Sequence, residues 1–335
     1  MTYSSFHLSC KLQFIIDAGW SSLVARQAHN LKVVGSNPTP ATKNFKMTKK
    51  FAYVIYKILN LLDSLINTLS GRKYLFWLKD FFHEDSYTKL LISNKKVTFF
   101  VPNSVTELRV KTLFTKEPET IKWIDNFDNQ NDFIFWDIGS NIGQYSIYAS
   151  LKHSNCHTIS FEPSTSNLRV LSRNISINNL SENIDIFSLP LTDKWGEFLM
   201  MNEKNFDEGR AQNSFGENVD FQGKNFSPKT KYKVMGISID KLIEDKIMKV
   251  PNYIKIDVDG IELKILEGAK SILANKELKS ISMEINEGLE EQYKSIIKLL
   301  SESGLEIKSK DRAESAYADD TKFKKQFNFV FERTI

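Results

Sequence analysis

From residue 133 onward, short apolar segments alternate with longer amphipathic segments. Short apolar segments are typical of buried strands, and their alternation with helices is typical of a parallel sheet that carries helices on both faces. The sequence therefore predicts an α/β fold with a mostly parallel seven-stranded sheet. The expected strands span 133–137, 158–161, 184–189, 253–256, 280–285, 305–308 and 327–331, and the expected helices span 142–151, 166–178, 239–245, 261–274 and 289–303.

Two helices are expected upstream of this pattern. Apolar residues recur at helical spacing over 51–69, and an aromatic-rich segment at 74–82 predicts a second helix. The polar face of the first helix is not rich in Lys or Arg, which favours packing on the main domain. The alternative is a weak contact of residues 51–82 with a membrane surface.

The other segments complete a division into three parts. A strand is expected at 96–101 and a helix at 110–127, while a polar, Asn- and Lys-rich segment at 193–232 interrupts the sheet pattern. The expected parts are a leader at 1–46, a helical N-terminal cap at 47–130 and a sheet domain at 131–335.

The first 46 residues hold the whole positive surplus of the chain. The net charge is +4, and these residues contain five basic residues and one acidic residue. One allowed codon choice for Gly19–Thr42 resembles an initiator-type transfer RNA gene, with an anticodon stem-loop, a T-loop and a terminal ACCA. We therefore expect that residues 1–46 are not part of the natural protein and that translation begins at Met47. The alternative is that they form a disordered basic leader. The remaining chain is neutral, so the main argument for a nucleic-acid partner is lost.

Cysteine content and apolar patterning indicate the compartment. Cys10 and Cys156 are too few for a disulfide framework, and no run of about 18 uncharged apolar residues is present. A secretory signal pattern is not visible. We therefore expect a reducing, cytoplasmic location, and the oligomeric state stays open.

Polar residues at the carboxyl ends of parallel strands form the candidate site, because ligands bind there. The first expected strand is followed by Asp137-Ile-Gly139-Ser-Asn141-Ile-Gly143-Gln144. Two glycines allow a tight turn whose backbone N–H groups can approach a ligand. The spacing differs from the dinucleotide pattern G-x-G-x-x-G, and Asp137 would repel a pyrophosphate. The turn indicates a ligand with an ammonium group or hydroxyls, such as S-adenosylmethionine.

Glu162 ends the second expected strand, 23 residues after Gly139. An acid at about this separation can accept hydrogen bonds from both ribose hydroxyls. The apolar segment that leads into Glu162 disfavours the alternative, a solvated surface carboxylate. We therefore expect Glu162 to bind the ribose.

A second group of acids follows two later strands. Asp257, Asp259 and Glu262 lie within six residues, and Glu284 ends the next expected strand. Buried charge is costly unless it is paired or metal-bound, so such groups usually mark a site. Asp257 is the first candidate for a general base and Glu284 the second, whereas Glu262 could instead cap a helix. Two acids could also bind Mg²⁺, but no third ligand is evident, so we expect no metal.

These motifs resemble those of the FkbM family of S-adenosylmethionine-dependent methyltransferases, over about residues 95–335. Asp259 departs from the Glu that many members have. The resemblance implies a Rossmann-like class I methyltransferase fold and methyl transfer to oxygen, often on sugars or secondary metabolites. The matching segments are Phe135–Gly143, Phe161-Glu-Pro163, the pair Asn174 and Asn178, Ser238-Ile-Asp240 and Ile254–Ala269.

The resemblance also implies roles for individual residues. The segment 193–232 and the helices before residue 95 would cover the acceptor side. Arg109, Glu117 and Glu119 either face the cofactor or acceptor or are surface charges. The methionine end of the cofactor would be held by Asp137, Gly139, Asn141 and Gly143, with Gln144 beside them, the ribose by Glu162, and the adenine by the region around Leu191.

Two other functions compete with methyl transfer. A NAD-dependent oxidoreductase could use a similar sheet, but the missing middle glycine and Asp137 disfavour it. The other is a non-catalytic protein that is peripheral to a membrane through residues 51–82. The expected partner of the enzyme is a small-molecule or glycan acceptor, and oxygen and nitrogen acceptors are not distinguished.

Overall fold

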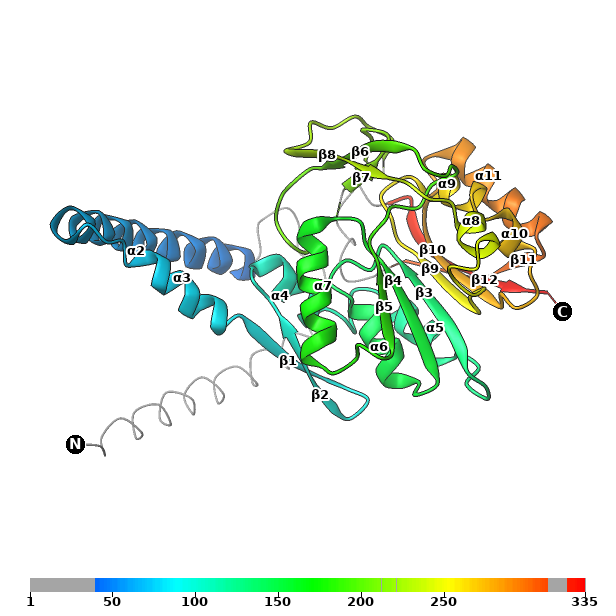
Figure 1. The fold of residues 1–335 in the computed structure, drawn as a ribbon, viewed down its shortest axis with the longest axis horizontal. Coiled ribbons are helices and arrows are strands. Elements are labelled where there is room, and N and C mark those ends of the chain that lie inside the picture. The colour runs from blue at the N-terminus through cyan, green and yellow to red at the C-terminus, as the bar shows by residue number, and fades with distance from the viewer. Residues whose placement is uncertain (1–39, 212, 221, 313–323, 335) are drawn as a thin grey trace. The chain divides into compact units, whose positions relative to one another are not determined.

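The computed structural model describes residues 40–211, 213–220, 222–312 and 324–334 (Figure 1). Most of the predicted leader lies outside these residues, and its last part begins helix α2 (Pro40–Ser70). The chain forms two compact units, with the boundary between Lys79 and Asp80. The boundary predicted at residue 130 stays a prediction.

The first unit contains α2 and the start of α3 (Leu75–Glu84), which confirms the two helices expected from the apolar spacing. Tyr74 Oη donates a hydrogen bond to the Leu59 carbonyl at 3.0 Å, and Leu75 N donates one to Asp63 Oδ1 at 3.0 Å. These bonds fix the turn between the helices. Within the described residues, no helix is long and apolar enough to cross a membrane.

The second unit is built on a seven-stranded sheet with the strand order β11-β12-β10-β9-β3-β4-β5. Neighbours from β10 through β5 pair in parallel, and β12 is antiparallel to both of its neighbours. This confirms the predicted α/β fold with a mostly parallel seven-stranded sheet. The strands are β3 (Phe133–Ile138), β4 (Cys156–Phe161), β5 (Ile184–Phe187), β9 (Tyr253–Ile256), β10 (Ser280–Asn286), β11 (Leu305–Asp311) and β12 (Gln326–Arg333).

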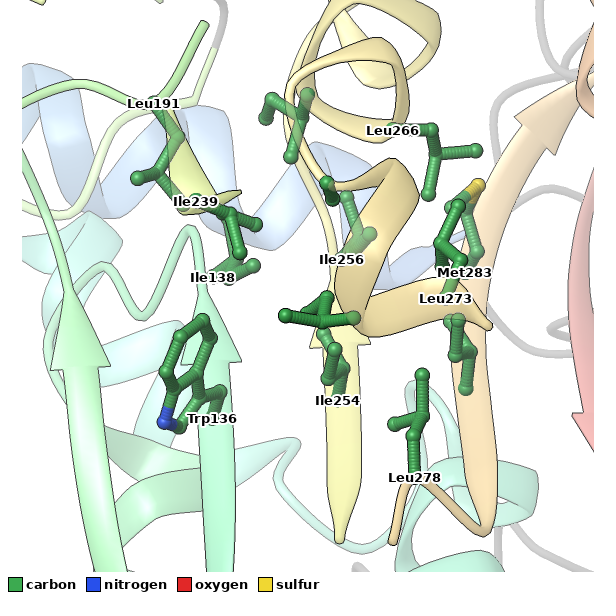
Figure 2. Packing of buried hydrophobic residues seen from close by; sticks show 14 of the residues in the cluster. Trp136, Ile138, Leu191, Ile239, Ile254, Ile256, Leu266, Leu273, Leu278 and Met283 are labelled. Atoms are coloured by element: carbon green, nitrogen blue, oxygen red, sulfur yellow. The ribbon is translucent and has the colours of Figure 1, made fainter. Parts of the chain in front are cut away.

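Helices cover both faces of this sheet, and each face has its own apolar core. Successive side chains of a strand point to opposite faces, so Phe135 belongs to one core and Trp136 to the other. Figure 2 shows the core that contains Trp136, Ile254 and Ile256. That core includes residues of α8 (Ile239–Glu244), α9 (Glu262–Glu267), α10 (Lys270–Leu273) and α11 (Glu290–Glu302), and the opposite core includes residues of α4 (Ser104–Lys111), α5 (Pro118–Asp125), α6 (Gln144–Lys152) and α7 (Thr165–Ile177).

Two expected helices are each split in the structure. Pro118 starts α5, so the helix expected at 110–127 is divided between α4 and α5. The helix expected at 261–274 is divided into α9 and α10 at Gly268. A Cβ atom on Gly268 would lie 2.2 Å from the Thr192 carbonyl oxygen, so only glycine fits this close approach.

Two small sheets flank the main one. The expected strand at 96–101 is confirmed as β2 (Lys95–Phe100), which pairs with β1 (Tyr87–Ile92) in a hairpin. The polar segment that interrupts the alternation forms β6 (Phe198–Glu203), β7 (Asn213–Phe215) and β8 (Thr230–Met235), with the order β7-β6-β8.

Candidate active site

A cavity lies at the carboxyl ends of the parallel strands. Its wall includes six of the nine predicted site residues and excludes Asp137, Gly143 and Gln144. The strands that bring the six together are β3, β4, β5, β9 and β10, whose carboxyl ends meet at one edge of the sheet. The six residues are Gly139, Asn141, Glu162, Leu191, Asp257 and Glu284.

The turn after β3 connects the ends of three strands. The backbone N–H groups of Gly139 and Ser140 both donate to the Phe161 carbonyl at 3.0 Å. Gly139 has a φ of +83°, and a Cβ atom there would lie 2.0 Å from the Asp257 carbonyl oxygen. Glycine is therefore required twice over at this position, by backbone conformation and by the close approach of the β9 loop.

Glu162 and Asn141 form the middle of the wall. Asn141 N donates to Glu162 Oε2 at 2.8 Å, and Ser164 N donates to Glu162 Oε1 at 2.8 Å. Burial raises the pKa of Glu162 to about 7, although these hydrogen bonds oppose the shift. Each carboxylate oxygen can accept a further hydrogen bond. Asn141 Oδ1 is buried and has no hydrogen-bond partner among the residues that the structure describes.

Asp137, Gly143 and Gln144 support the wall from behind. Asp137 is fully buried, accepts a hydrogen bond from Ser146 Oγ at 2.6 Å, and has a pKa that burial raises. Gly143 begins α6 at a φ of +83°, and a Cβ atom there would approach Leu171 of α7 to 2.5 Å. Gln144 Nε2 donates to the Arg109 carbonyl. The three residues thus position the turn and its neighbours.

Asp257 forms an ion pair at one end of the cavity. Its Oδ2 atom accepts a hydrogen bond from the buried Lys255 Nζ at 2.9 Å. Desolvation favours the neutral acid, but the charges of Lys255 and Lys116 outweigh it and lower the pKa of Asp257 to about 2. The ammonium of Lys255 also lies 4.8 Å from the centre of the Tyr145 ring. Asp257 is therefore charged at any ordinary pH.

Glu284 lines the same cavity in a different electrostatic state. Burial and the negative charge of Asp257 raise the pKa of Glu284 well above the ordinary carboxyl range. Gln326 Nε2 donates a hydrogen bond to its Oε1 atom. A carboxylate with a raised pKa is a stronger base than one with a lowered pKa. Glu284 is therefore better suited to accept a proton than Asp257.

The charged residues of α4, α5 and the link between these helices differ in their surroundings. Arg109 and Lys116 line the cavity, whereas Glu117 and Glu119 do not. Glu117 is buried and accepts a hydrogen bond from Tyr145 Oη at 2.9 Å, so the interpretation of Glu117 as a surface charge is wrong. Glu119 is half-buried and accepts a hydrogen bond from an Asn side chain of β12 at 2.6 Å.

The acids after β9 also separate into two roles. Asp259 lines the cavity, and its Oδ2 atom accepts a hydrogen bond from Asn213 N at 3.3 Å. Glu262 does not line the cavity; it accepts hydrogen bonds from Gly260 N at 3.0 Å and Gln292 Nε2 at 2.9 Å. Burial raises the pKa of Glu262 to about 8. This arrangement agrees with the alternative given for Glu262 above, a structural role at the start of helix α9.

The loop between β6 and β7 belongs to the segment 193–232, which was expected to cover the acceptor side, but the sequence did not indicate which of its residues line the cavity. The side chain of Asn167 accepts a hydrogen bond from Gly209 N at 2.8 Å and donates one to the Arg210 carbonyl at 3.3 Å. Asn141 Nδ2 donates to the same carbonyl at 3.1 Å. Arg210, Ala211 and Asn213 consequently line the cavity. No motif signals this, because the partners lie more than 40 positions away in the chain.

The cavity has an apolar end and a charged end. The ends of β4 and β5 lie on one side of β3 in the sheet, and β9 and β10 lie on the other. The glycine turn therefore separates the two ends. Among the described residues, no group of three His, Cys, Asp or Glu side chains is arranged to hold a metal ion. The apolar end contains Phe161, Pro163, Leu189, Pro190 and Leu191, and the charged end contains Arg109, Lys116, Asp257, Asp259 and Glu284.

Residues 137–307 match the family model of the methyltransferase FkbM domain, and this match includes all nine predicted site residues. The chain belongs to the FkbM methyltransferase family. Its sheet is a Rossmann-like class I methyltransferase fold with one antiparallel strand, β12. The resemblance seen in the sequence is thereby confirmed.

Named relatives of this FkbM chain include one curated protein and several solved structures. Hexuronic acid methyltransferase AglP of Haloferax volcanii is 29% identical over 179 residues, which are 52% of this chain and 64% of AglP. The chain thus matches less than two thirds of that relative. Methyltransferase FkbM from Methylobacillus flagellatus KT is 17% identical, with a TM-score of 0.37 over 60% of this chain and 43% of that one. Precorrin-6y C5,15-methyltransferase from Geobacter metallireducens GS-15 is 14% identical, with a TM-score of 0.37 over 76% and 96%.

Proposed function

We propose that the protein is an S-adenosylmethionine-dependent O-methyltransferase that acts on a hydroxyl group of a sugar, a glycan or a secondary metabolite. The observation that carries this proposal is the placement of Glu284, a carboxylate of raised pKa, at the charged end of a cavity formed by the FkbM motifs. A neutral hydroxyl needs a base when it attacks a methyl group.

The residues of the cavity fit S-adenosylmethionine. Glu162 would accept hydrogen bonds from the ribose hydroxyls, and the apolar end around Leu191 would contact the adenine. Asn141 Oδ1, which lacks a partner among the described residues, would accept a hydrogen bond from the ligand. The buried carboxyl group of Asp137 lies beneath the turn, and a cationic group bound above the turn would favour its charged form. When bound, S-adenosylmethionine supplies an electrophilic methyl group on its sulfonium.

The chain's own contribution is then orientation and proton transfer. The narrow turn at Gly139 and the β6–β7 loop would hold the two reactants in line, which is the main requirement of a displacement reaction. Glu284 would take the proton of the acceptor hydroxyl as its oxygen attacks. Lys116 and Arg109 supply positive charge at the same end of the cavity.

A sugar acceptor is supported by the relative rather than by the cavity alone. AglP is named for a hexuronic acid, which is a sugar that carries a carboxylate. Lys116 and Arg109 line the charged end, where they could bind such a group. We therefore place sugars and glycans first among the acceptor classes.

Ligand binding tests the choice of cofactor and distinguishes the proposed methyltransferase from an oxidoreductase. S-adenosylhomocysteine is expected to raise the thermal unfolding temperature of the purified protein, and NAD is expected to leave it unchanged. Stabilisation by NAD alone would overturn the proposal. Mass spectrometry of glycans from a deletion strain would then identify the acceptor, because the glycan that loses a methyl group is the product.

A further inference from the structure

Over residues 51–69, helix α2 carries a continuous, exposed apolar stripe. At 100° per residue, the stripe spans about 140° of the helix circumference. On α3, Phe76 and Trp77 are 61% and 67% exposed. The stripe residues, each at least 41% exposed, are Phe51, Val54, Ile55, Ile58, Leu61, Leu62, Leu65, Ile66 and Leu69.

The same segment is basic, whereas residues 80–335 are acidic. Residues 48–79 contain six basic residues and a single acid, Asp63. Residues 80–335 contain 34 basic and 39 acidic residues. From residue 48 onward, positive charge is therefore concentrated on the segment that also exposes apolar side chains.

We infer that residues 48–79 bind the surface of an anionic lipid bilayer, with the apolar stripe of α2 inserted among the lipids. An interfacial helix combines a wide apolar face with cations that can reach lipid headgroups and with aromatic residues near the boundary. The polar face of α2 as a whole is not rich in Lys or Arg, so the cations at the edge of the stripe carry the argument. Lys50 and Lys57 lie next to the edge of the stripe, where long side chains can reach lipid headgroups while the stripe is buried. Lys49 lies on the opposite face.

A second copy of the chain is the main competing occupant of the stripe. Two-stranded coiled coils use a narrow seam of two positions in seven, and their flanking positions carry charges of both signs. The α2 stripe is wider than such a seam, and the described flanking charges are lysines. Repulsion between these lysines disfavours a parallel pair of α2 helices, whereas anionic lipids attract them.

Vesicle sedimentation of the full chain tests this inference. Vesicles of phosphatidylcholine with about 30% phosphatidylserine are expected to bind the protein at least tenfold more tightly than phosphatidylcholine alone. Raising the salt concentration should weaken the binding, because surface charges are screened. Binding that ignores lipid charge and salt would contradict the inference.

Neutral substitutions separate the two contributions. Ile58→Gln with Leu62→Gln removes apolar surface from the stripe, and Lys49→Gln with Lys50→Gln and Lys57→Gln removes charge; each set should weaken vesicle binding at least tenfold. The matched control is Asn60→Gln with Asn67→Gln on the opposite face, which should bind as the unchanged protein does. Circular dichroism and S-adenosylhomocysteine binding should stay unchanged in all three variants, which verifies folding.

Three results would overturn the inference. The first is an absence of vesicle binding at every lipid composition. The second is an equal loss of binding in the stripe and control variants. The third is a dimer in solution that the stripe substitutions dissociate, together with no vesicle binding, because the stripe would then be an interface between two copies.

Discussion

Asp257 and Glu284 line one cavity, yet their pKa values are shifted in opposite directions. Lys255 holds Asp257 as a carboxylate with a pKa of about 2, and burial together with that fixed negative charge raises the pKa of Glu284. The sequence ranks Asp257 first as a base, because it shows clustered acids but not their partners. The ion pair between Lys255 and Asp257, which the sequence does not show, makes Asp257 the weaker base of the two.

Glu284→Gln removes the proposed base and nearly preserves side-chain shape. The expected result is a loss of about 100- to 10,000-fold in kcat with unchanged affinity for S-adenosylhomocysteine. The measurement is methyl transfer to the identified acceptor, with calorimetry for binding. Glu290→Gln, on exposed residue 290 of α11, is the matched control and should keep full activity. A Glu284→Gln enzyme of normal kcat would contradict the assignment.

Asp257→Asn should shift the pH profile of methyl transfer. In the unchanged protein, activity should rise as Glu284 loses its proton, at a pH above the ordinary carboxyl range. Removing the charge of Asp257 stabilises ionised Glu284, so its pKa falls and the acidic limb moves to lower pH. The measurement is kcat/KM against pH. An unmoved or oppositely moved limb would show that the two carboxylates do not interact.

Among the secondary-structure elements, β2 depends on α7 for its position. Phe100 N donates to Asn174 Oδ1 at 2.7 Å, and Asn174 Nδ2 donates to the Ile142 carbonyl at 2.9 Å. Asn178 forms a similar pair of bonds with Thr98. The paired asparagines of the FkbM motif thus attach a hairpin to a helix, and one of them also holds the turn that follows Asn141.

Asn174→Ala should destabilise the protein by about 2–4 kcal/mol, because it leaves a buried donor and a buried acceptor without partners. Urea unfolding measures the change. Ser172→Ala alters an exposed position on the same helix and should stay within about 0.5 kcal/mol of the unchanged protein. Equal effects of the two substitutions would mean that the two hydrogen bonds of Asn174 contribute little.

Local patterns predicted some elements better than others. The strands β3, β4, β9 and β10 were visible as short apolar segments, and the glycine turn and Glu162 followed from their spacing. The segment 193–232 was expected to cover the acceptor side, but the residues of its β6–β7 loop that line the cavity could not be named, because hydrogen bonds from Asn141 and Asn167 fix the loop. Asp137 was expected to touch the ligand, but a fully buried position beneath the turn depends on packing that spacing does not show.

At the scale of the whole molecule, the sheet could be predicted because its central strands β3, β4, β9 and β10 are mostly buried and therefore largely apolar. The order of the strands in the sheet could not be predicted from the apolar segments. That order determines which strand ends lie next to each other at the cavity. The insertion of β12 between β10 and β11 brings Gln326 beside Glu284, although 42 positions separate them in the chain.

A chain that begins at Asp80 should fold on its own and bind S-adenosylhomocysteine as tightly as the full chain does. The compact second unit starts at this residue, and the first residue of the cavity wall is Arg109. Thermal unfolding with and without the ligand measures both properties. Loss of cooperative unfolding in the shortened chain would contradict independent folding.

The opposite charges of the two units mean that the isoelectric point of about 8.7 describes neither of them. A proteolytic cut near Lys79 would release an acidic fragment with five more carboxylates than basic side chains. At neutral pH an anion exchanger should therefore retain the large fragment more strongly than the intact chain, whose net charge is +4 over all 335 residues and zero when counted from Met47. Ion-exchange chromatography could consequently separate full-length protein from protein that has lost its helical segment, although both carry the complete cavity.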